Sequence, residues 1–262
     1  MSTGIGVGIS GNVFQTKAGL GGGSTPPAVC PTAYSCSYDG VTEFQQGSAV
    51  PGLGTSNFSI SFWIKTPDPS GAGQNQRIIG KFSGTTQWTI YYNTTNSKFQ
   101  WVSSDSGSGT SWNDGYGTYS PVADQWDHIV YSVDRSGDAI WYANGGNSNS
   151  VSVSATTVDF GTDGIFYIGR NASGQYFEGN ITEISMWNKA LTSAEVLELY
   201  NNMSGNEYCL GDLSMGANLT NWWRMFNPSG TYVDPIPNAA SGGTITLANT
   251  NMSATNVSTD VP

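Results

Sequence analysis

The sequence has few charged residues, and most of them are acidic. Charged residues make up 11% of its 262 residues, and 9 Lys and Arg stand against 19 Asp and Glu, which gives a net charge of -10. Proteins that bind nucleic acid through its phosphates need clustered Lys and Arg side chains. We therefore expect no nucleic-acid partner.

Cysteine and histidine are also scarce. The three cysteines, Cys30, Cys36 and Cys209, allow at most one disulfide bond within the chain, and the spacing of the first two does not fit a zinc site. We expect three reduced thiols. The one histidine, His128, lies inside a strand-like pattern, which favours a buried structural role over that of a general base.

Long hydrophobic runs are missing. No segment approaches the roughly 20 apolar residues that cross a bilayer, so we expect no membrane insertion. The first residues, MSTGIGVGISGNVFQTK, lack the basic and apolar regions of a secretory signal, so export through that route is not expected.

Strand patterns fill the middle of the chain. In Phe58 to Lys65, Phe and Ile alternate with mostly polar residues, which predicts a central strand with one buried face. Similar segments recur about every ten residues, as in antiparallel sandwiches: Arg77 to Phe82, Gln87 to Tyr92, Lys98 to Val102, Trp126 to Val133 and Asp138 to Tyr142.

The segment from Ile165 to Asn202 predicts a strand, a loop, a second strand and a short helix. Its strands are Ile165 to Arg170 and Ile181 to Trp187. Thr192 and Glu195 then form a T-x-x-E capping box. An apolar stripe at helical spacing follows, made of Leu191, Val196, Leu199 and Tyr200.

This order resembles the closing signature of LamG-like jelly rolls in the concanavalin A-like lectin and glucanase superfamily. The matching residues are Tyr167, Gly169, Arg170, Gly179, Ile181, Glu183, Trp187, Ala190, Leu191, Thr192 and Glu195. Tyr38, Asp39 and Gly40 resemble the strand that opens these domains, and Trp126 and His128 resemble another family strand. The resemblance implies an all-β, two-sheet antiparallel jelly-roll sandwich with one short helix.

The last part of the chain also resembles a family segment, in a different position. Trp222, Asp234 and Gly242 resemble a motif that in many LamG-like domains precedes the opening strand. Residues 28–262 are therefore expected to form one domain, with 209–262 as a permuted closing segment. This permuted arrangement resembles virion proteins of tailed phages.

Residues 1–27 form a Gly-rich N-terminal arm. Ile5, Val7 and Ile9 alternate with glycines, so one face of an extended arm is bare and another backbone can approach it closely. We expect these residues, together with Phe14, to form an assembly arm that contacts other subunits; a disordered tail is the alternative.

Aromatic and amide residues in the polar segment Ser103 to Pro121 suggest glycan binding, because sugar C–H faces stack on aromatic rings. The candidates are Trp112, Asn113, Asp114, Tyr116 and Tyr119, in what is predicted to be a long loop. A role of these aromatics in pinning the loop or in a subunit contact is equally supported.

Metal and catalytic residues are harder to find. Calcium is common in LamG-like domains, and Asp105, Asp114 and Asp163 are weak candidates for binding it, but they form no D-x-D-x-D cluster. The E-x-D-x-E carboxylates of related glucanases are missing. Glu183 is expected to be structural, pairing with Arg170 or the Gly179 region. We expect no catalytic residue and no required cofactor.

These observations favour a non-enzymatic virion structural protein, either a capsid decoration protein or a tail or fibre component. It is expected to oligomerise, to contact other virion proteins and to adhere to host-surface or environmental glycans. The alternative is a soluble lectin-like module of a cell-surface protein, located outside the cell. A glycanase is the third hypothesis.

Overall fold

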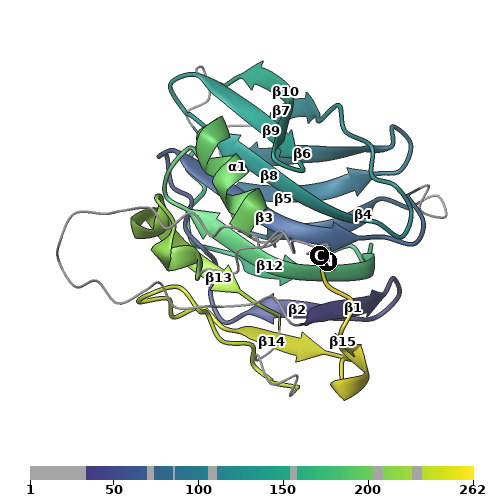
Figure 1. Ribbon diagram of the computed structural model, residues 1–262. Coiled ribbons are helices and arrows are strands. Elements are labelled where there is room, and N and C mark those ends of the chain that lie inside the picture. Colours follow the sequence, from purple (N-terminus) through teal and green to yellow (C-terminus); the bar gives the residue numbers. More distant parts are fainter. Residues whose placement is uncertain are drawn as a thin grey trace, which may run out of the picture.

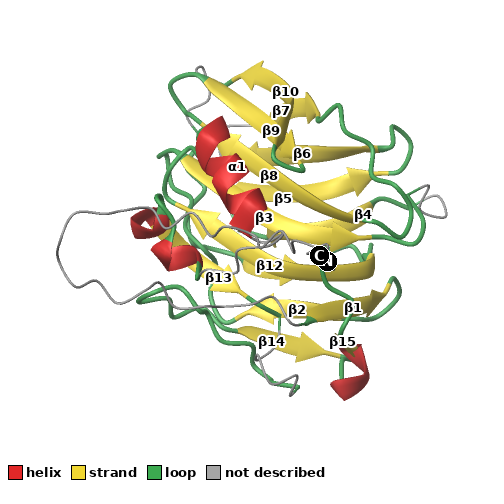
Figure 2. Ribbon diagram, viewed as in Figure 1, coloured by secondary structure: helices red, strands yellow, loops and turns green. Residues whose placement is uncertain are grey.

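Two antiparallel β-sheets pack face to face in the computed structural model (Figures 1 and 2), which describes residues 34–69, 74–84, 86–105, 111–153, 158–202, 209–225 and 232–262. Sheet 1 has the order β10 (Gly146–Ser152), β9 (Asp138–Ala143), β8 (Trp126–Val133), β3 (Phe58–Lys65), β12 (Glu178–Trp187), β1 (Ser35–Asp39) and β15 (Val257–Ser258), and β13 (Leu219–Trp223) also pairs with β12. Sheet 2 has the order β14 (Leu247–Thr250), β2 (Phe44–Gly47), β11 (Ile165–Ile168), β4 (Gln76–Phe82), β5 (Thr86–Asn93), β6 (Lys98–Asp105) and β7 (Ser111–Tyr116). The predicted all-β jelly-roll sandwich is confirmed.

The strand predictions hold in position and differ in extent. β3 and β8 have the predicted bounds, and β5 and β6 extend beyond their apolar runs because they pair from Thr86–Asp105 to Asn93–Lys98. The prediction of one long loop from Ser103 to Pro121 is wrong, because the end of β6 and all of β7 lie there. Polar residues continue a strand when a neighbouring strand completes the ladder of hydrogen bonds.

Aromatic side chains fill the space between the sheets. Trp88 and Trp101 stack with ring centroids 5.3 Å apart, Trp101 lies 4.9 Å from Tyr131, and Tyr131 lies 4.5 Å from Trp141. These four side chains are at most 1% exposed. Because each buried aromatic residue contributes roughly 1.5–3 kcal/mol, this column links the two sheets strongly.

The outer face of sheet 1 is also buried, which corrects the prediction that β3 has a single buried face. A second apolar cluster joins Trp63 of β3, Val130 of β8 and Tyr142 of β9 to Val196 and Leu199 of helix α1 (Ser193–Asn201). Figure 1 shows α1 lying across these strands. The 3-10 turns η3 (Leu210–Asp212) and η4 (Gly216–Asn218) belong to the same covering segment, to which Leu210, Leu213 and Met215 contribute buried side chains.

Helix α1 begins as the sequence predicts. The Thr192 side chain accepts a hydrogen bond from the Glu195 backbone N–H at 3.4 Å, and the Glu195 carboxylate accepts one from the Thr192 N–H at 2.9 Å. Leu191, Val196 and Leu199 of the predicted stripe are at most 2% exposed. The reciprocal cap satisfies backbone donors that the first turn leaves unpaired.

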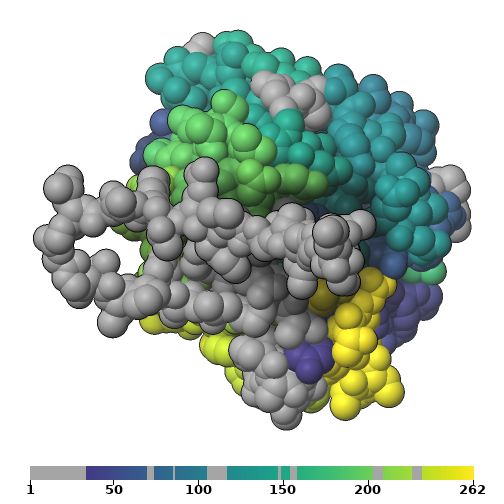
Figure 3. Space-filling model, viewed as in Figure 1, coloured from purple at the N-terminus to yellow at the C-terminus, as the bar shows by residue number. Residues whose placement is uncertain are grey.

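The C-terminal segment completes both sheets. β14 pairs with β2, and β15 pairs with β1 after the 3-10 turn η5 (Ala254–Asn256). Beyond β15, the Asp260 carboxylate accepts hydrogen bonds from Lys65 Nζ at 2.7 Å and Trp126 Nε1 at 2.9 Å. Figure 3 shows these yellow residues beside the purple strand β1. The last residues therefore contact the chain's own sheet 1.

The expectation of three reduced thiols is wrong. Cys209 is disulfide-bonded, and its partner lies outside the described residues. Cys36 is free and fully buried, and burial raises the pKa of its thiol to about 12, so it is a poor nucleophile at neutral pH. Cysteine spacing in the sequence could not reveal the bond, because the pairing depends on the fold.

The predicted assembly arm lies outside the described residues, including Ile5, Val7, Ile9 and Phe14. In the part of the chain that is described, no helix has the length and apolar character to span a membrane.

Candidate functional site

The outer face of sheet 2 carries rings, amides and guanidinium groups. Along β5, Trp88, Ile90 and Tyr92 point into the core, so the residues between them point outward. The register places the outward residues of neighbouring strands in rows: Tyr91 pairs with Arg77 on β4 and with Gln100 on β6. We call this surface the outer face of sheet 2; its residues include Phe44, Arg77, Phe82, Thr89, Tyr91, Asn93, Gln100 and Tyr167.

A hydrogen-bonded row runs across this face. The Arg77 guanidinium lies 4.1 Å from the centroid of the Tyr91 ring, and the Tyr91 hydroxyl donates to Gln100 Oε1. Asn93 Nδ2 donates to the same oxygen at 3.1 Å. Burial lowers the pKa of Arg77 below its ordinary value, and an arginine side chain stays charged at neutral pH. The row is fixed before any ligand arrives.

The β11–β12 connection extends the row. Gln175 Oε1 accepts hydrogen bonds from Arg77 Nη2 at 2.8 Å and from Asn171 Nδ2 at 2.8 Å. Arg170, just before Asn171, lies over three rings, with its guanidinium carbon 4.5 Å from Phe44, 4.9 Å from Tyr167 and 5.4 Å from Tyr176. Such stacking holds the loop against the sheet.

This face has the chemistry that recognises carbohydrate. Half-buried Tyr167 and Tyr176 offer some ring surface, while half-buried Arg77 and Gln175 offer fixed polar groups. Sugars bind through C–H faces on aromatic rings and hydroxyls on amides and charged groups. The arrangement suits binding and orientation of a ligand rather than bond cleavage.

The predicted glycan-binding residues divide between two places. β7 pairs Tyr116 with Gln100 and Asn113 with Val102, which puts both at outer-face positions, whereas Trp112 pairs with inward-facing Ser103. Asp114 lies between them in a stretch where the register shifts. The side chains of these four β7 residues lie outside the described part of the structure.

Tyr119 lies apart from that face. Its hydroxyl donates to Asp127 Oδ1 and accepts a hydrogen bond from Asn144 Nδ2 at 3.2 Å. Burial raises the pKa of Tyr119, and it also raises the pKa of Asp127. Tyr119 thus joins a polar cluster at the ends of β8 and β9, where it fixes the chain rather than extending the candidate site.

The structure does not bring the three calcium candidates together in a metal site among the residues that it describes. The carboxylate of Asp163 pairs with Lys81 Nζ at 2.7 Å, and the same ammonium donates to Thr86 Oγ1 and the Gly161 carbonyl. Among the described residues no group of three or more His, Cys, Asp or Glu could hold a metal ion. The side chains of Asp105 and Asp114 lie outside those residues. Asp163 therefore serves as the counter-charge of a fully buried lysine.

Glu183 is structural, although its partners differ from those predicted. It lies at a β-bulge of β12 with φ 52° and is 3% exposed. Its carboxylate accepts hydrogen bonds from Trp222 Nε1 and, at 3.3 Å, from Arg224 Nε. The sequence suggested Arg170 or the Gly179 region, but Arg170 stacks on sheet 2 while Arg224 follows β13, the neighbour of β12.

His128 is buried beneath helix α1. Its Nε2 lies 2.8 Å from Ser61 Oγ, and its ring lies 5.0 Å from Trp63 and 5.9 Å from Tyr200. Burial lowers its pKa to about 3. The side chain is 1% exposed, so it cannot exchange protons with a bound substrate as a general base does.

Sequence reasoning missed the centre of the candidate face. Arg77, Tyr91 and Gln100 are far apart in the chain and only strand register brings them into one row. One signal was available: the outward positions of β5 alternate Gln87, Thr89, Tyr91 and Asn93 with core residues. Polar and aromatic residues at such positions indicate a face that is not covered by a helix.

Comparisons with solved structures place the fold. A Bacteroides ovatus protein to which carbohydrate binding has been ascribed has a TM-score of 0.59 and 18% identity, covering 86% of this chain and 58% of that protein. Domain 4 of AbnA, an extracellular arabinanase of Geobacillus stearothermophilus bound to arabinotriose, has a TM-score of 0.50 and 21% identity over 68% of this chain and 82% of that domain. A heptameric pentraxin of Limulus polyphemus has a TM-score of 0.50 and 14% identity, covering 66% of this chain and 84% of the pentraxin chain.

No curated protein sequence matches this chain. A family model described as "Concanavalin A-like lectin/glucanases superfamily" matches residues 39–197, a range that runs from the end of β1 into helix α1 and contains the candidate face. The chain therefore belongs to the concanavalin A-like lectin/glucanases superfamily, in its Laminin G 3 family.

Proposed function

We propose that this protein is a carbohydrate-binding, lectin-like module that does not cleave its ligand, and that the outer face of sheet 2 is the binding surface. The fixed position of half-buried Arg77 carries the proposal, because its guanidinium lies over the Tyr91 ring and donates to half-buried Gln175, which places a charge and an amide side by side at the surface. Tyr91 and Gln100 are 7% and 2% exposed and support this position from within the face. The names of two structural relatives, the Bacteroides ovatus protein and the arabinotriose-bound domain, support the same ligand class.

The absence of cleavage is proposed from the roles of the two strongest catalytic candidates. Glu183 is occupied by Trp222 and Arg224, and His128 is buried under α1. Glycoside hydrolysis needs two carboxyl groups facing each other across a cleft. Release of new reducing ends from a polysaccharide by the pure protein would contradict this part of the proposal.

A glycan array followed by calorimetry with the best ligand tests the binding surface. Arg77→Met removes the guanidinium while keeping most of the side-chain volume. We expect it to raise Kd by about tenfold to a hundredfold, since a hydrogen bond to a charged group contributes roughly 1.5–3 kcal/mol. Lys189→Met is the matched control, because it removes one positive charge beside α1, on the other sheet. Equal binding by both variants, or an array without signal, would refute the assignment.

At a finer level, we propose that the module is a structural component of a phage particle, in the capsid decoration or the tail or fibre. The chain order supports this, because the segment with β13, β14 and β15 follows helix α1 and still completes both sheets. Copies of itself and other virion proteins are the proposed partners, and the virion is the proposed location. A cell-surface lectin remains the alternative that glycan binding alone also supports.

Mass spectrometry of purified particles tests the virion proposal, which predicts that the protein is present in them. Deletion of residues 1–25 should abolish its incorporation while leaving glycan binding unchanged. Normal incorporation of the truncated chain would refute the arm's role in assembly.

A further inference from the structure

A hollow of about 240 Å³ lies at one end of the sandwich, away from the row on sheet 2. One wall is formed by five residues of the connection from β2 to β3: Gly52, Leu53, Gly54, Ser56 and Asn57. The rest is formed by Phe58 at the start of β3, Trp187 at the end of β12, Asn188 directly after it, and Thr220 in β13. Apart from the connection, the hollow is built on strands of sheet 1.

The lining is apolar at its base and polar at its rim. Phe58 and Trp187 are each 1% exposed, whereas Ser56, Asn188 and Thr220 are exposed at the surface. None of the residues that line the hollow has an ionisable side chain. A charged ligand would lose its hydration there without gaining an opposite charge, so the site favours a neutral ligand.

Each wall is held in place by a different neighbour. Gly54 exchanges two backbone hydrogen bonds with Phe160, of 3.3 and 3.1 Å. Asn57 Oδ1 accepts a bond from the Arg135 N–H at 2.8 Å. The hollow therefore keeps its shape without a ligand, which lowers the entropic cost of binding.

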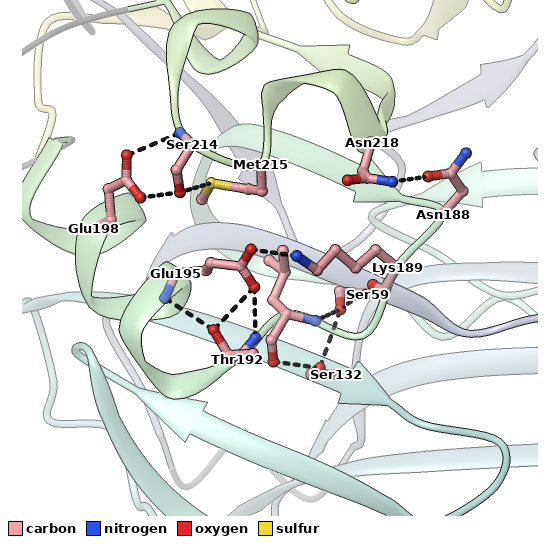
Figure 4. Close-up of polar contacts among 11 residues, drawn as sticks. Ser59, Ser132, Asn188, Lys189, Thr192, Glu195, Glu198, Ser214, Met215 and Asn218 are labelled. Atoms are coloured by element: carbon pink, nitrogen blue, oxygen red, sulfur yellow. Dashed lines mark hydrogen bonds and ion pairs between the residues drawn. The ribbon is translucent and has the colours of Figure 1, made fainter.

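The wall at the end of β12 is fixed by two hydrogen bonds of Asn188. The Asn188 N–H donates to the Asn218 carbonyl at 2.9 Å, and Asn188 Oδ1 accepts from Asn218 Nδ2, also at 2.9 Å. Figure 4 shows that this contact turns the amide nitrogen of Asn188 away from Asn218. The amide is thus oriented as a donor at the rim.

Serine side chains brace the connection that follows Asn188. Ser59 Oγ donates to the Lys189 carbonyl at 2.8 Å and accepts from the Leu191 N–H at 3.0 Å, while Ser132 Oγ donates to the Leu191 carbonyl at 2.9 Å (Figure 4). These bonds tie the connection to β3 and β8. They hold the chain segment that follows Asn188 in one position.

We propose that the hollow is a second binding site, which takes a single neutral sugar ring. Its volume is below the roughly 300–1,000 Å³ of sites for drug-sized ligands, so one ring fits it better than a chain of sugars. The apolar base faces the C–H side of the ring, and Ser56 and Asn188 bond its hydroxyls. The Thr220 hydroxyl donates to the Met186 carbonyl at 3.0 Å, so towards a ligand it can only accept. This site is separate from the proposed surface on sheet 2, and either can exist without the other.

A ¹H–¹⁵N NMR titration of the full chain with methyl glycosides of glucose, galactose, mannose and N-acetylglucosamine tests the site. We expect at least one to shift the amide signals of Gly52, Gly54 and Asn188 in a saturable manner, and glucuronic acid to shift them far less. The amides of Tyr91 and Gln100 report the sheet 2 surface in the same spectra, so failure of one site is distinguished from failure of the other.

Two variants with matched controls locate the contact. Ser56→Phe fills the hollow and should abolish the shifts, whereas Ser120→Phe, at another exposed serine, should not. Asn188→Ala should raise Kd by about threefold to tenfold, as loss of one neutral hydrogen bond does, and Asn96→Ala should leave it unchanged. No saturable shift with any glycoside, equal shifts with glucuronic acid, or unchanged binding in both Ser56→Phe and Asn188→Ala would overturn the proposal.

Discussion

The free energy of unfolding should fall by about 2 kcal/mol between about pH 7.5 and pH 5 because of His128 alone. This side chain is 1% exposed, and burial lowers its pKa in the folded state to about 3. In the unfolded chain its pKa returns to about 6.5. Below that value the unfolded chain binds a proton that the folded chain does not, so protonation favours unfolding.

The magnitude follows from the two pKa values. For each pH unit between them, the free energy of unfolding falls by about 1.4 kcal/mol as the pH is lowered. Roughly one and a half units separate 6.5 from pH 5. Some carboxyl groups have a lowered pKa in the folded state, for example those of Asp39, Asp134 and Asp260. Their protonation also lowers the free energy of unfolding as the pH falls, but at more acidic pH than His128 does. Asp127, whose pKa is raised by burial, acts in the opposite direction. The range above about pH 5 therefore isolates the histidine best.

Urea denaturation followed by tryptophan fluorescence at several pH values measures this slope. The comparison is with His128→Gln, which cannot titrate and keeps a nitrogen near Ser61. The carboxylates are common to both proteins, so the difference between the two slopes belongs to His128. Because the chain has one histidine, its imidazole signal in an NMR titration is also unambiguous. The same pH dependence in both proteins, or a folded-state pKa near 6.5, would refute the reasoning.

Three further predictions concern the free energy of unfolding, which urea denaturation measures in each case. Asp163→Asn should cost about 1–3 kcal/mol, because Lys81 would stay buried without its counter-charge, and adding Lys81→Met should restore most of the loss; a double variant no more stable than the single one would contradict this. Thr192→Ala should cost about 1 kcal/mol through loss of the helix cap, whereas Thr192→Ser should cost little, and equal losses would argue against the cap. Gly179→Ala should cost more than about 4 kcal/mol, since a Cβ would lie 2.1 Å from a β3 carbonyl oxygen at φ 126°, while Gly211→Ala, in open space, should be tolerated; similar stability of the two would refute the clash.

Local patterns in the sequence were enough to predict the helix and the strands with a strong apolar pattern, but not β7 or β10, whose residues are mostly polar. The alternation of Phe58 to Lys65 and the capping box of Thr192 and Glu195 act through neighbours in the chain, so they are visible without a fold. The same alternation misled about burial, because Trp63 is covered by a helix more than 100 residues later. What covers a sheet is set by tertiary packing, which alternation does not encode.

The candidate site was predicted only in part, for a similar reason. Asn113 and Tyr116 were chosen for their residue types, and pairing of β7 with β6 places them at outer-face positions of sheet 2. Tyr119 was chosen on the same grounds and lies in another cluster with Asp127. A segment read as one loop was divided by a strand, so residues close in sequence came to lie in different places.

The outer faces of the two sheets are covered differently. After β12 the chain must return to pair β13 with the same strand, so the segment between them lies over the outer face of sheet 1. Trp63, Val130 and Tyr142 on that face are apolar enough to bury the stripe of α1. The corresponding positions of sheet 2 carry Arg77 and Gln100, whose burial under a helix would cost the hydration of a charge and an amide. Instead Arg77 bonds to Gln175, and Gln100 accepts bonds from Tyr91 and Asn93. Both groups are therefore satisfied within the face, where Gln100 is 2% exposed and Arg77 is half-buried. Under the proposed function, the half-buried groups of this face, Arg77, Gln175 and Tyr167, are the ones that exchange water for the hydroxyls of a sugar.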